Sequence, residues 1–132
     1  SPGMDLIRMP EGAFRSEDDY SATLAHELIH ATGHSRRLDR LRKIDEWYPQ
    51  DSRAAYAFEE LVAELGAAFL CAEHGIAGEH LQHEAYIDFW LQALKRDKTL
   101  IFKAARLASE AHRFVMRVPE AEGVAETLAT AA

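Results

Sequence analysis

The feature that most constrains this chain is a pair of histidines, His26 and His30, spaced four residues apart. On an α-helix this spacing places both imidazoles on one face, one turn apart, so both rings can reach the same metal ion. Glu27 lies about 100° around the helix from His26, given roughly 3.6 residues per turn. Its carboxylate can therefore face the open side of such an ion and take a proton from a metal-bound water. The pattern predicts a helix with a metal centre on one face.

The residues around this pattern predict a helix from about Ser16 to Thr32. Ser16 is a suitable N-cap residue, and the three acidic residues that follow it suit the positive end of a helix dipole. Apolar residues recur at helical spacing, and Gly33 suits the position just after the helix. The alternative is two surface histidines on an ordinary amphipathic helix. The agreement between the motif and the helix boundaries favours the metal site.

A second stretch carries carboxylates that could complete the site. The residues from Tyr56 to His74–Gly75 predict a long helix whose small residues permit close packing against another helix. Glu60 and Glu64 share one face, and two carboxylates in a closely packed region are costly unless a cation pairs with them. We predict Glu60 as the third ligand of a His-His-Glu zinc site, with Glu59 as the alternative ligand. Glu64 is predicted to accept the distal N–H of a ligand histidine.

Two other interpretations of these polar residues stay open. The glutamates of the second helix could form a solvated acidic face. His34 continues the four-residue spacing of the histidines and could be a third ligand, but Gly33 indicates that the helix has already ended. In the longer pattern H-E-x-x-H-x-x-G-x-x-H the last histidine would fall where this chain has Arg36. We therefore expect His34 to cap the chain locally or to line the cleft.

The remaining elements predict an α+β fold that is predominantly helical. Residues Asp5 to Pro10 alternate in polarity and stop at a proline, which predicts a short edge strand packed on the first helix. Leu38 to Ser52 is expected to be irregular. Two further helices are predicted, from His80 to Leu94 and from Leu100 to Met116.

The third predicted helix offers two candidates for stabilising a transition state. His83 and Tyr86 are three residues apart and could point the same way, so that one of them donates a hydrogen bond to the oxyanion of a tetrahedral intermediate. Tyr20 is a further candidate for this role. The alternative is that the aromatic ring packs between helices and the histidine lies on the surface.

Length and composition suit one compact domain. The chain has 132 residues, 48% of them hydrophobic, and we expect residues 1–117 to fold together and residues 118–132 to be poorly ordered. No apolar run approaches the roughly 20 residues that span a bilayer, which predicts no membrane partner. The single cysteine, Cys71, is expected to be a buried thiol in a reducing, cytoplasmic setting.

The charge argues against nucleic-acid binding by this domain itself. The net charge is −7 with neutral histidines, whereas nucleic-acid-binding domains usually carry a basic excess. Residues 36–43 form the one dense basic run. They could contact phosphate, but a solvated helix face or loop is the favoured interpretation.

The three richest segments together resemble a known family. His26 to His34, Glu59 to Leu70 and Tyr86 to Leu91 are similar to the zincin-like metallopeptidase domain of ArdC antirestriction proteins and TraC-type plasmid primases, also called the polyvalent-protein metallopeptidase domain. The resemblance extends from about Asp5 to Phe114. The first motif alone would not be specific, but the combination is.

The resemblance implies a gluzincin-like site and a zincin-like fold. His26 and His30 match the two ligand histidines of the family, and Glu27 matches the catalytic glutamate. Glu60 matches the glutamate ligand on the following helix, and Glu64 its neighbour one turn on. The expected cofactor is one Zn²⁺ per chain, and the expected activity is hydrolysis of peptide bonds with Glu27 as the general base.

The resemblance also implies a biological setting. Family members travel on plasmids, phages and integrated elements of bacteria, which fits a cytoplasmic location, and they are linked to the protection of incoming DNA. The expected partner is a protein or peptide substrate, while single-stranded DNA would bind to an N-terminal domain that is absent from this chain. One alternative is a catalytically silent scaffold that binds proteins and thereby acts against restriction. The other is an accessory domain that binds single-stranded DNA directly.

Overall fold

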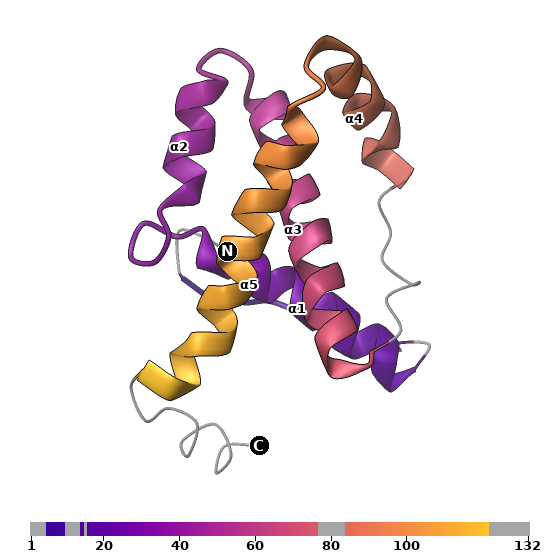
Figure 1. Cartoon of the computed structure of the whole chain (residues 1–132), viewed down its shortest axis with the longest axis vertical. Helices are drawn as coiled ribbons and strands as arrows, with labels where there is room; N and C mark the ends of the chain where they lie inside the picture. Colours follow the sequence, from indigo (N-terminus) through magenta and orange to yellow (C-terminus); the bar gives the residue numbers. More distant parts are fainter. Residues whose placement is uncertain (1–4, 10–13, 15, 77–83, 122–132) are drawn as a thin grey trace.

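The fold is a helical bundle built around one long central helix. The computed structural model describes residues 5–9, 14, 16–76 and 84–121, with no description of the side chains of residues 84–87 and 118–121. The long central helix, α3, packs against all four of the other helices (Figure 1). The helices in chain order are α1 (Glu17–Thr32), α2 (Arg40–Trp47), α3 (Ser52–His74), α4 (Glu84–Arg96) and α5 (Leu100–Ala121).

The predicted α+β class with an N-terminal strand is wrong. Within the described part of the chain every regular element is a helix. A strand exists only through a backbone ladder to a neighbour, and the described residues contain no second strand with which residues 5–9 could pair. Asp5 also has a positive φ of 49°, which departs from an extended chain. The adjacent residues Leu6 and Ile7 instead line a cavity beside α1.

The prediction for α1 is confirmed, although Gly33 ends the helix for a different reason. The Ser16 hydroxyl accepts a hydrogen bond from the Asp19 N–H at 3.1 Å and caps the first turn. Gly33 has a φ of −76°, so the left-handed conformation that usually selects glycine after a helix is not needed. A Cβ at Gly33 would lie 2.9 Å from Nη2 of Arg40. Glycine is therefore required to leave room for that guanidinium.

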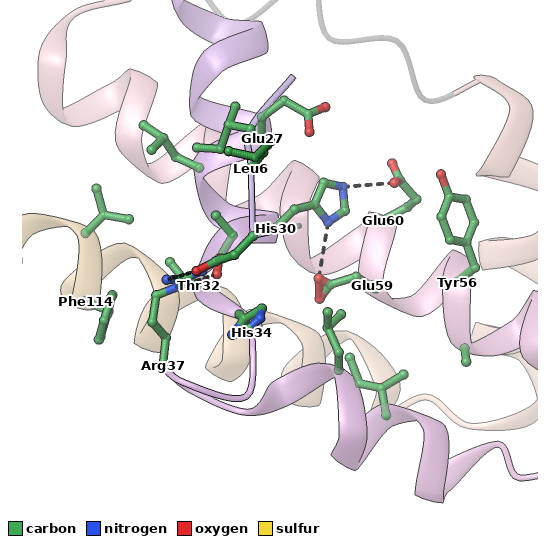
Figure 2. A pocket seen from close by; sticks show the side chains of 18 of the residues that line it. Leu6, Glu27, His30, Thr32, His34, Arg37, Tyr56, Glu59, Glu60 and Phe114 are labelled. Carbon is green, nitrogen blue, oxygen red and sulfur yellow. Dashed lines mark hydrogen bonds and ion pairs between the residues drawn. The ribbon is translucent and has the colours of Figure 1, made fainter. Parts of the chain in front are cut away.

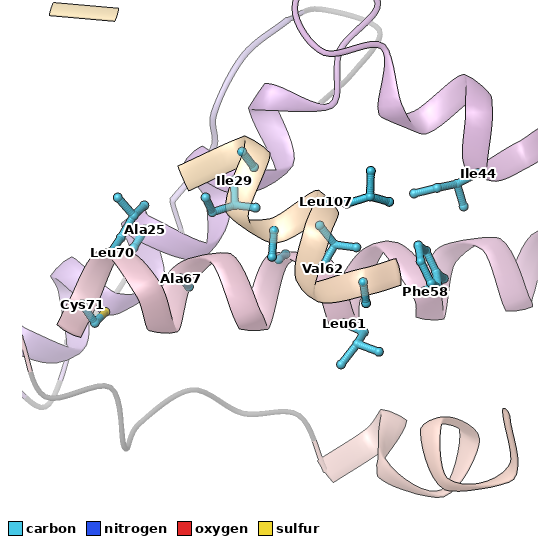
Figure 3. Packing of buried hydrophobic residues seen from close by; sticks show 14 of the residues in the cluster. Ala25, Ile29, Ile44, Phe58, Leu61, Val62, Ala67, Leu70, Cys71 and Leu107 are labelled. Carbon is cyan, nitrogen blue, oxygen red and sulfur yellow. The ribbon is translucent and has the colours of Figure 1, made fainter. Parts of the chain in front are cut away.

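The core lies where α1, α3 and α5 meet. Ile29 and Val62 are fully buried, and Figure 3 shows them grouped with Leu107 of α5. The two helices α1 and α3 pack closely at Gly66, where a Cβ would lie 2.9 Å from three side-chain atoms of Ile29. This close approach positions the polar faces of α1 and α3 against each other. Cys71 is buried, as predicted.

The prediction of irregular structure between Leu38 and Ser52 is wrong, because this stretch contains α2. The apolar anchor of α2 is Ile44, which is 1% exposed. Arg40 is only 2% exposed, so the basic run is not entirely a solvated face or loop. The helix begins after Asp39, which has a positive φ of 52°. The sequence pattern is weak here because the helix is short, and one of its two buried side chains is the charged Arg40.

The remaining helices follow the predicted order with shifted ends. The predicted end of α3 is confirmed: Gly75 follows His74 with a φ of 67°, as a left-handed cap requires. In the structure α4 spans Glu84–Arg96, and the first residues predicted for it, from His80, lie outside the described residues. The last helix, α5, extends to Ala121, while residues 122–132 lie outside the described part, so the predicted poorly ordered tail stays a prediction.

In the described part of the chain, no helix combines the length and the apolar character that a bilayer span requires.

We predict that Gly66→Ala destabilises the domain by about 1–3 kcal/mol, because the added methyl overpacks the contact with Ile29. Helix propensity alone predicts the opposite sign, since alanine is favoured over glycine inside a helix by about 1 kcal/mol. The measurement is the free energy of unfolding in urea, made by circular dichroism.

The control is a double-mutant cycle with Ile29→Ala, which removes the atoms that the new methyl would meet. Gly66→Ala should cost less in that background than in the wild type. An equal cost in both backgrounds, or a stabilisation in the wild type, would contradict the close packing of α1 and α3.

Candidate metal centre

Three side chains from α1 and α3 converge on one point. His26, His30 and Glu60 each offer one ligand atom, and these atoms lie within 4.8 Å of one another. Nε2 of His26 lies 3.2 Å from Glu60 Oε2, and Nε2 of His30 lies 2.9 Å from Glu60 Oε1. The structure thus brings together the three residues that the sequence indicates as ligands.

The chemistry of this cluster fits a cation. The two Nε2 atoms face each other at 3.0 Å, and the carboxylate of Glu60 lies against both. If each ring carries its N–H on the outer Nδ1, the two Nε2 lone pairs and the carboxylate of Glu60 face one another, and a metal ion or an added proton then has to lie among them. Two imidazole nitrogens and one carboxylate oxygen are a ligand set that zinc accepts, with further positions left for water or substrate.

The outer nitrogens of both histidines face carboxylates of α3. Nδ1 of His26 lies 3.0 Å from Glu64 Oε1, although the pair is not aligned as a regular hydrogen bond and this buried nitrogen has no other partner in the described residues. Nδ1 of His30 lies 3.3 Å from Glu59 Oε2. The position of Glu64 is the predicted one. Glu59, predicted only as an alternative ligand, instead contacts the outer side of His30.

The carboxylates control the charge of the site. Burial favours the neutral form of both rings, but the contact with Glu60 and the nearby negative charges of Glu60 and Glu64 outweigh it and raise the pKa of His26 to about 10. Burial is similarly outweighed by Glu59 and Glu60 at His30, where the pKa rises to about 9. For Glu60, burial is opposed by the two histidines, which lower its pKa to about 2. In the absence of metal, protons therefore supply the positive charge at neutral pH.

The cluster opens into a large cavity. The cavity has a volume of about 1280 Å³, and both Glu27 and His30 line it together with Glu60 (Figure 2). Its walls also include apolar side chains from three parts of the chain: Leu6 and Ile7 near the N-terminus, Leu28 of α1, and Phe114, Val115 and Met116 of α5. Figure 2 shows Leu6 beside Glu27 and Phe114 at the far end from Tyr56. The predicted general base therefore shares an open, largely apolar space with the ligands.

The other predicted site residues lie outside the group of three candidate ligands or have no described side chain. His34 lies outside the group of ligand atoms; its Nδ1 accepts a hydrogen bond from the Arg36 N–H at 3.1 Å, and it lines the cavity. His83 lies outside the described residues, and Tyr86 belongs to α4 but its side chain is not described. Tyr20 is 44% exposed, and its ring makes an edge contact with Phe14.

Sequence reasoning missed one participant, Arg40. It lies on α2, and its guanidinium binds Glu59. Its position within a run of basic residues gave no signal that this arginine would be buried. The only available hint was Gly33, whose missing side chain leaves the space that the guanidinium fills.

Comparisons with known proteins agree on one family. The family model of a zincin-like metallopeptidase matches residues 1–107. The DNA primase TraC of Escherichia coli is 44% identical over 116 residues, which are 87% of this chain and 10% of the primase. An uncharacterised protein of Sinorhizobium fredii is 40% identical over 111 residues, or 83% of this chain and 34% of that protein.

A solved structure is also similar. The crystal structure of a plasmid-encoded antirestriction protein ArdC, in its metal-free form, matches with a TM-score of 0.74 and 44% identity. The match covers 89% of this chain and 41% of the ArdC chain. This chain therefore spans only a minor part of each of these relatives.

We predict that the stability of the metal-free domain falls as the pH rises from about 6.5 to 10. A histidine whose pKa is raised by folding stabilises the folded state below its ordinary pKa of 6.5, and this contribution is lost as the pH passes the raised values of about 10 and 9. Glu60, whose pKa is lowered to about 2, contributes above 4.5 and is lost in acid. Thermal midpoints measured in chelator across this range test the prediction.

The control is the same series with zinc present. Zinc competes with protons for the histidine nitrogens, so the gap between the zinc-loaded and metal-free midpoints should widen as the pH rises from 5.5 to 8. A metal-free midpoint that rises between pH 6.5 and 9 would contradict the protonated cluster.

Proposed function

The chain belongs to the zincin-like metallopeptidase family, and on this premise we propose that it is the zinc-dependent peptidase domain of an ArdC-like antirestriction protein. His26, His30 and Glu60 bind one zinc ion per chain. The observation that carries the proposal is the convergence of these three side chains, with ligand atoms within 4.8 Å, beside a cavity that His30 and Glu60 line together with Glu27.

In the proposed mechanism, each residue around the zinc site has a separate role in peptide hydrolysis. A bound zinc ion would lower the pKa of a coordinated water and polarise the carbonyl of a substrate. The carboxylate of Glu27 accepts the proton of the attacking water and delivers it to the leaving amine. Glu64 holds Nδ1 of His26, so that Nε2 keeps its lone pair directed at the ligand cluster. His83 and Tyr86 stay candidates for a hydrogen bond to the oxyanion.

The cavity sets the class of substrate. Its volume of about 1280 Å³ exceeds what a single amino acid needs, and residues along α1 from Glu27 to Thr32 line it. A protein or peptide segment can therefore lie across Glu27 and the ligand His30. The apolar residues Leu28 and Phe114 supply contacts for its side chains.

The whole protein would combine this domain with a second function. The chain corresponds to 41% of the ArdC relative and 10% of the TraC primase, which leaves most of each relative outside the match. We place the binding of single-stranded DNA in a region beyond the matched part, because this domain carries a net charge of −7. The setting would be the cytoplasm of a bacterium that carries a mobile element.

Protein purified without added metal should contain about one zinc ion per chain. Glu60→Ala should lose most of this zinc, because a third ligand is removed, whereas His34→Ala should keep it, because His34 lies outside the ligand cluster. Elemental analysis after gel filtration measures both. Absence of zinc from the wild type, even after incubation with excess zinc, would refute the proposed cofactor.

Glu27→Gln should abolish peptide hydrolysis, with a loss of at least about 100-fold as expected for a general base, while leaving the zinc content unchanged. The substrate is an unfolded casein or a fluorescent peptide library, and the readout is new amino termini. If Glu27→Gln and the wild type protect DNA from restriction equally well in cells, the domain acts as a silent binding scaffold instead.

A further inference from the structure

We propose that Glu59, held in place by Arg40, is a positioning residue for the ligand His30. This inference rests on the proposed zinc site and extends it to two residues that lie behind the ligands. It follows from contacts among three different helices, since the partly buried His30 lies on α1, and the buried Arg40 and Glu59 lie on α2 and α3.

The contact between Arg40 and Glu59 is a buried, two-point ion pair. Nε of Arg40 donates to Glu59 Oε1 at 2.6 Å, and Nη2 donates to Oε2 at 2.9 Å. Arg40 is 2% exposed and Glu59 is 4% exposed, so neither charge is compensated by bulk water. A bidentate pair of this kind fixes the plane of the carboxylate as well as its position.

Further contacts fix the guanidinium itself. Nη1 of Arg40 donates to Thr32 Oγ1 at 2.9 Å, and Nη2 also donates to the Ile29 carbonyl at 2.8 Å. The Thr32 hydroxyl in turn donates to the same carbonyl at 2.6 Å. Because these acceptors lie at the C-terminal end of α1, the arginine is anchored to the helix that carries His30. Gly33 leaves the space for it.

The consequence reaches the metal site through His30. Nδ1 of His30 lies 3.3 Å from Glu59 Oε2, while Nε2 faces Glu60 and His26. A carboxylate at Nδ1 keeps the N–H on that nitrogen and leaves Nε2 with the lone pair that a metal needs. The two hydrogen bonds from Arg40 hold the Glu59 carboxylate in place and keep it from rotating into the ligand cluster. Glu59 is thus the counterpart of Glu64, which faces Nδ1 of His26.

The competing role for Glu59 is that of a zinc ligand. The geometry argues against it, because both of its oxygens already accept hydrogen bonds from Arg40. Moving one oxygen to the metal would break half of this two-point contact and leave a buried N–H of Arg40 without that acceptor. In the described part of the chain Glu60 is paired with no guanidinium, and it lies against both Nε2 atoms.

The test compares Glu59→Gln with the wild type in two measurements. An amide has only one oxygen, so Arg40 and the Nδ1–H of His30 compete for it. Zinc affinity, measured by competition with a chromophoric chelator, should fall about 10- to 100-fold, the range typical when a residue behind a metal ligand is changed. In the metal-free protein, the Nδ1–H resonance of His30 in the proton NMR spectrum should exchange faster with solvent.

Two further variants separate positioning from folding. Glu73→Gln is the matched control, because Glu73 also lies on α3 and pairs with a histidine, His112, that is not part of the ligand cluster. It should leave zinc affinity within about twofold of the wild type. Arg40→Lys keeps the charge but loses the two-point contact, and it should lower zinc affinity to a lesser degree than Glu59→Gln. If Glu59→Gln does not fold, the zinc affinity of Arg40→Lys tests the positioning role instead.

The outcomes distinguish this inference from the proposed function. Unchanged zinc affinity in the folded Glu59→Gln or Arg40→Lys variant would overturn the positioning role while leaving the zinc site intact. A wild type that binds no zinc would overturn the proposed function. In that case the NMR measurement still tests the contact between His30 and Glu59. The contact is supported if the Nδ1–H of His30 exchanges faster with solvent in Glu59→Gln and keeps its slow exchange in Glu73→Gln.

Discussion

The structure depends on how buried carboxylates of the central helix α3 are neutralised. Glu59 and Glu60 are adjacent residues, and both are buried on a helix that contacts every other helix of the bundle. An uncompensated buried charge costs several kcal/mol, which is comparable with the total stability of a small domain. The fold resolves the problem with two different cations. Glu59 receives a permanent one from α2, the guanidinium of Arg40, whereas Glu60 faces two histidines that can exchange a proton for a metal ion.

The packing of α1 on α3 makes this neutralisation possible. Because Gly66 has no side chain, Ile29 can approach the backbone of α3. This close packing places His26 and His30 in contact with Glu60. Small residues in a helix are usually interpreted as allowing close packing of apolar surfaces, but the two glycines here face side chains of opposite character. Gly66 admits an apolar side chain, and Gly33 admits a charged one. Both act through the absence of a Cβ and not through an unusual backbone angle.

The parts of the molecule that could be predicted from sequence are those set by local spacing. His26, His30 and Glu60 could be identified because helical periodicity places them on defined faces, and the boundaries of α1 follow from a local cap. The features that could not be predicted depend on contacts between residues far apart in the sequence. The helix α2 forms around Arg40, which pairs with a residue 19 positions away, and no local pattern marks that contact. The predicted strand failed for the same reason, since a strand depends on a partner elsewhere in the chain.

The same electrostatics explains how the domain can exist with or without metal. Small zinc domains that lack a core unfold when the ion is removed, because binding supplies their folding free energy. Here the core of α1, α3 and α5 is apolar and independent of the ligands, and the raised pKa values of His26 and His30 let protons occupy the place of the ion. In the proposed zinc site, loss of the metal would therefore replace the ion by protons and would leave Glu60 facing positive charge. Such a site would couple metal affinity to pH, since a zinc ion would have to displace protons from histidines whose pKa the glutamates raise.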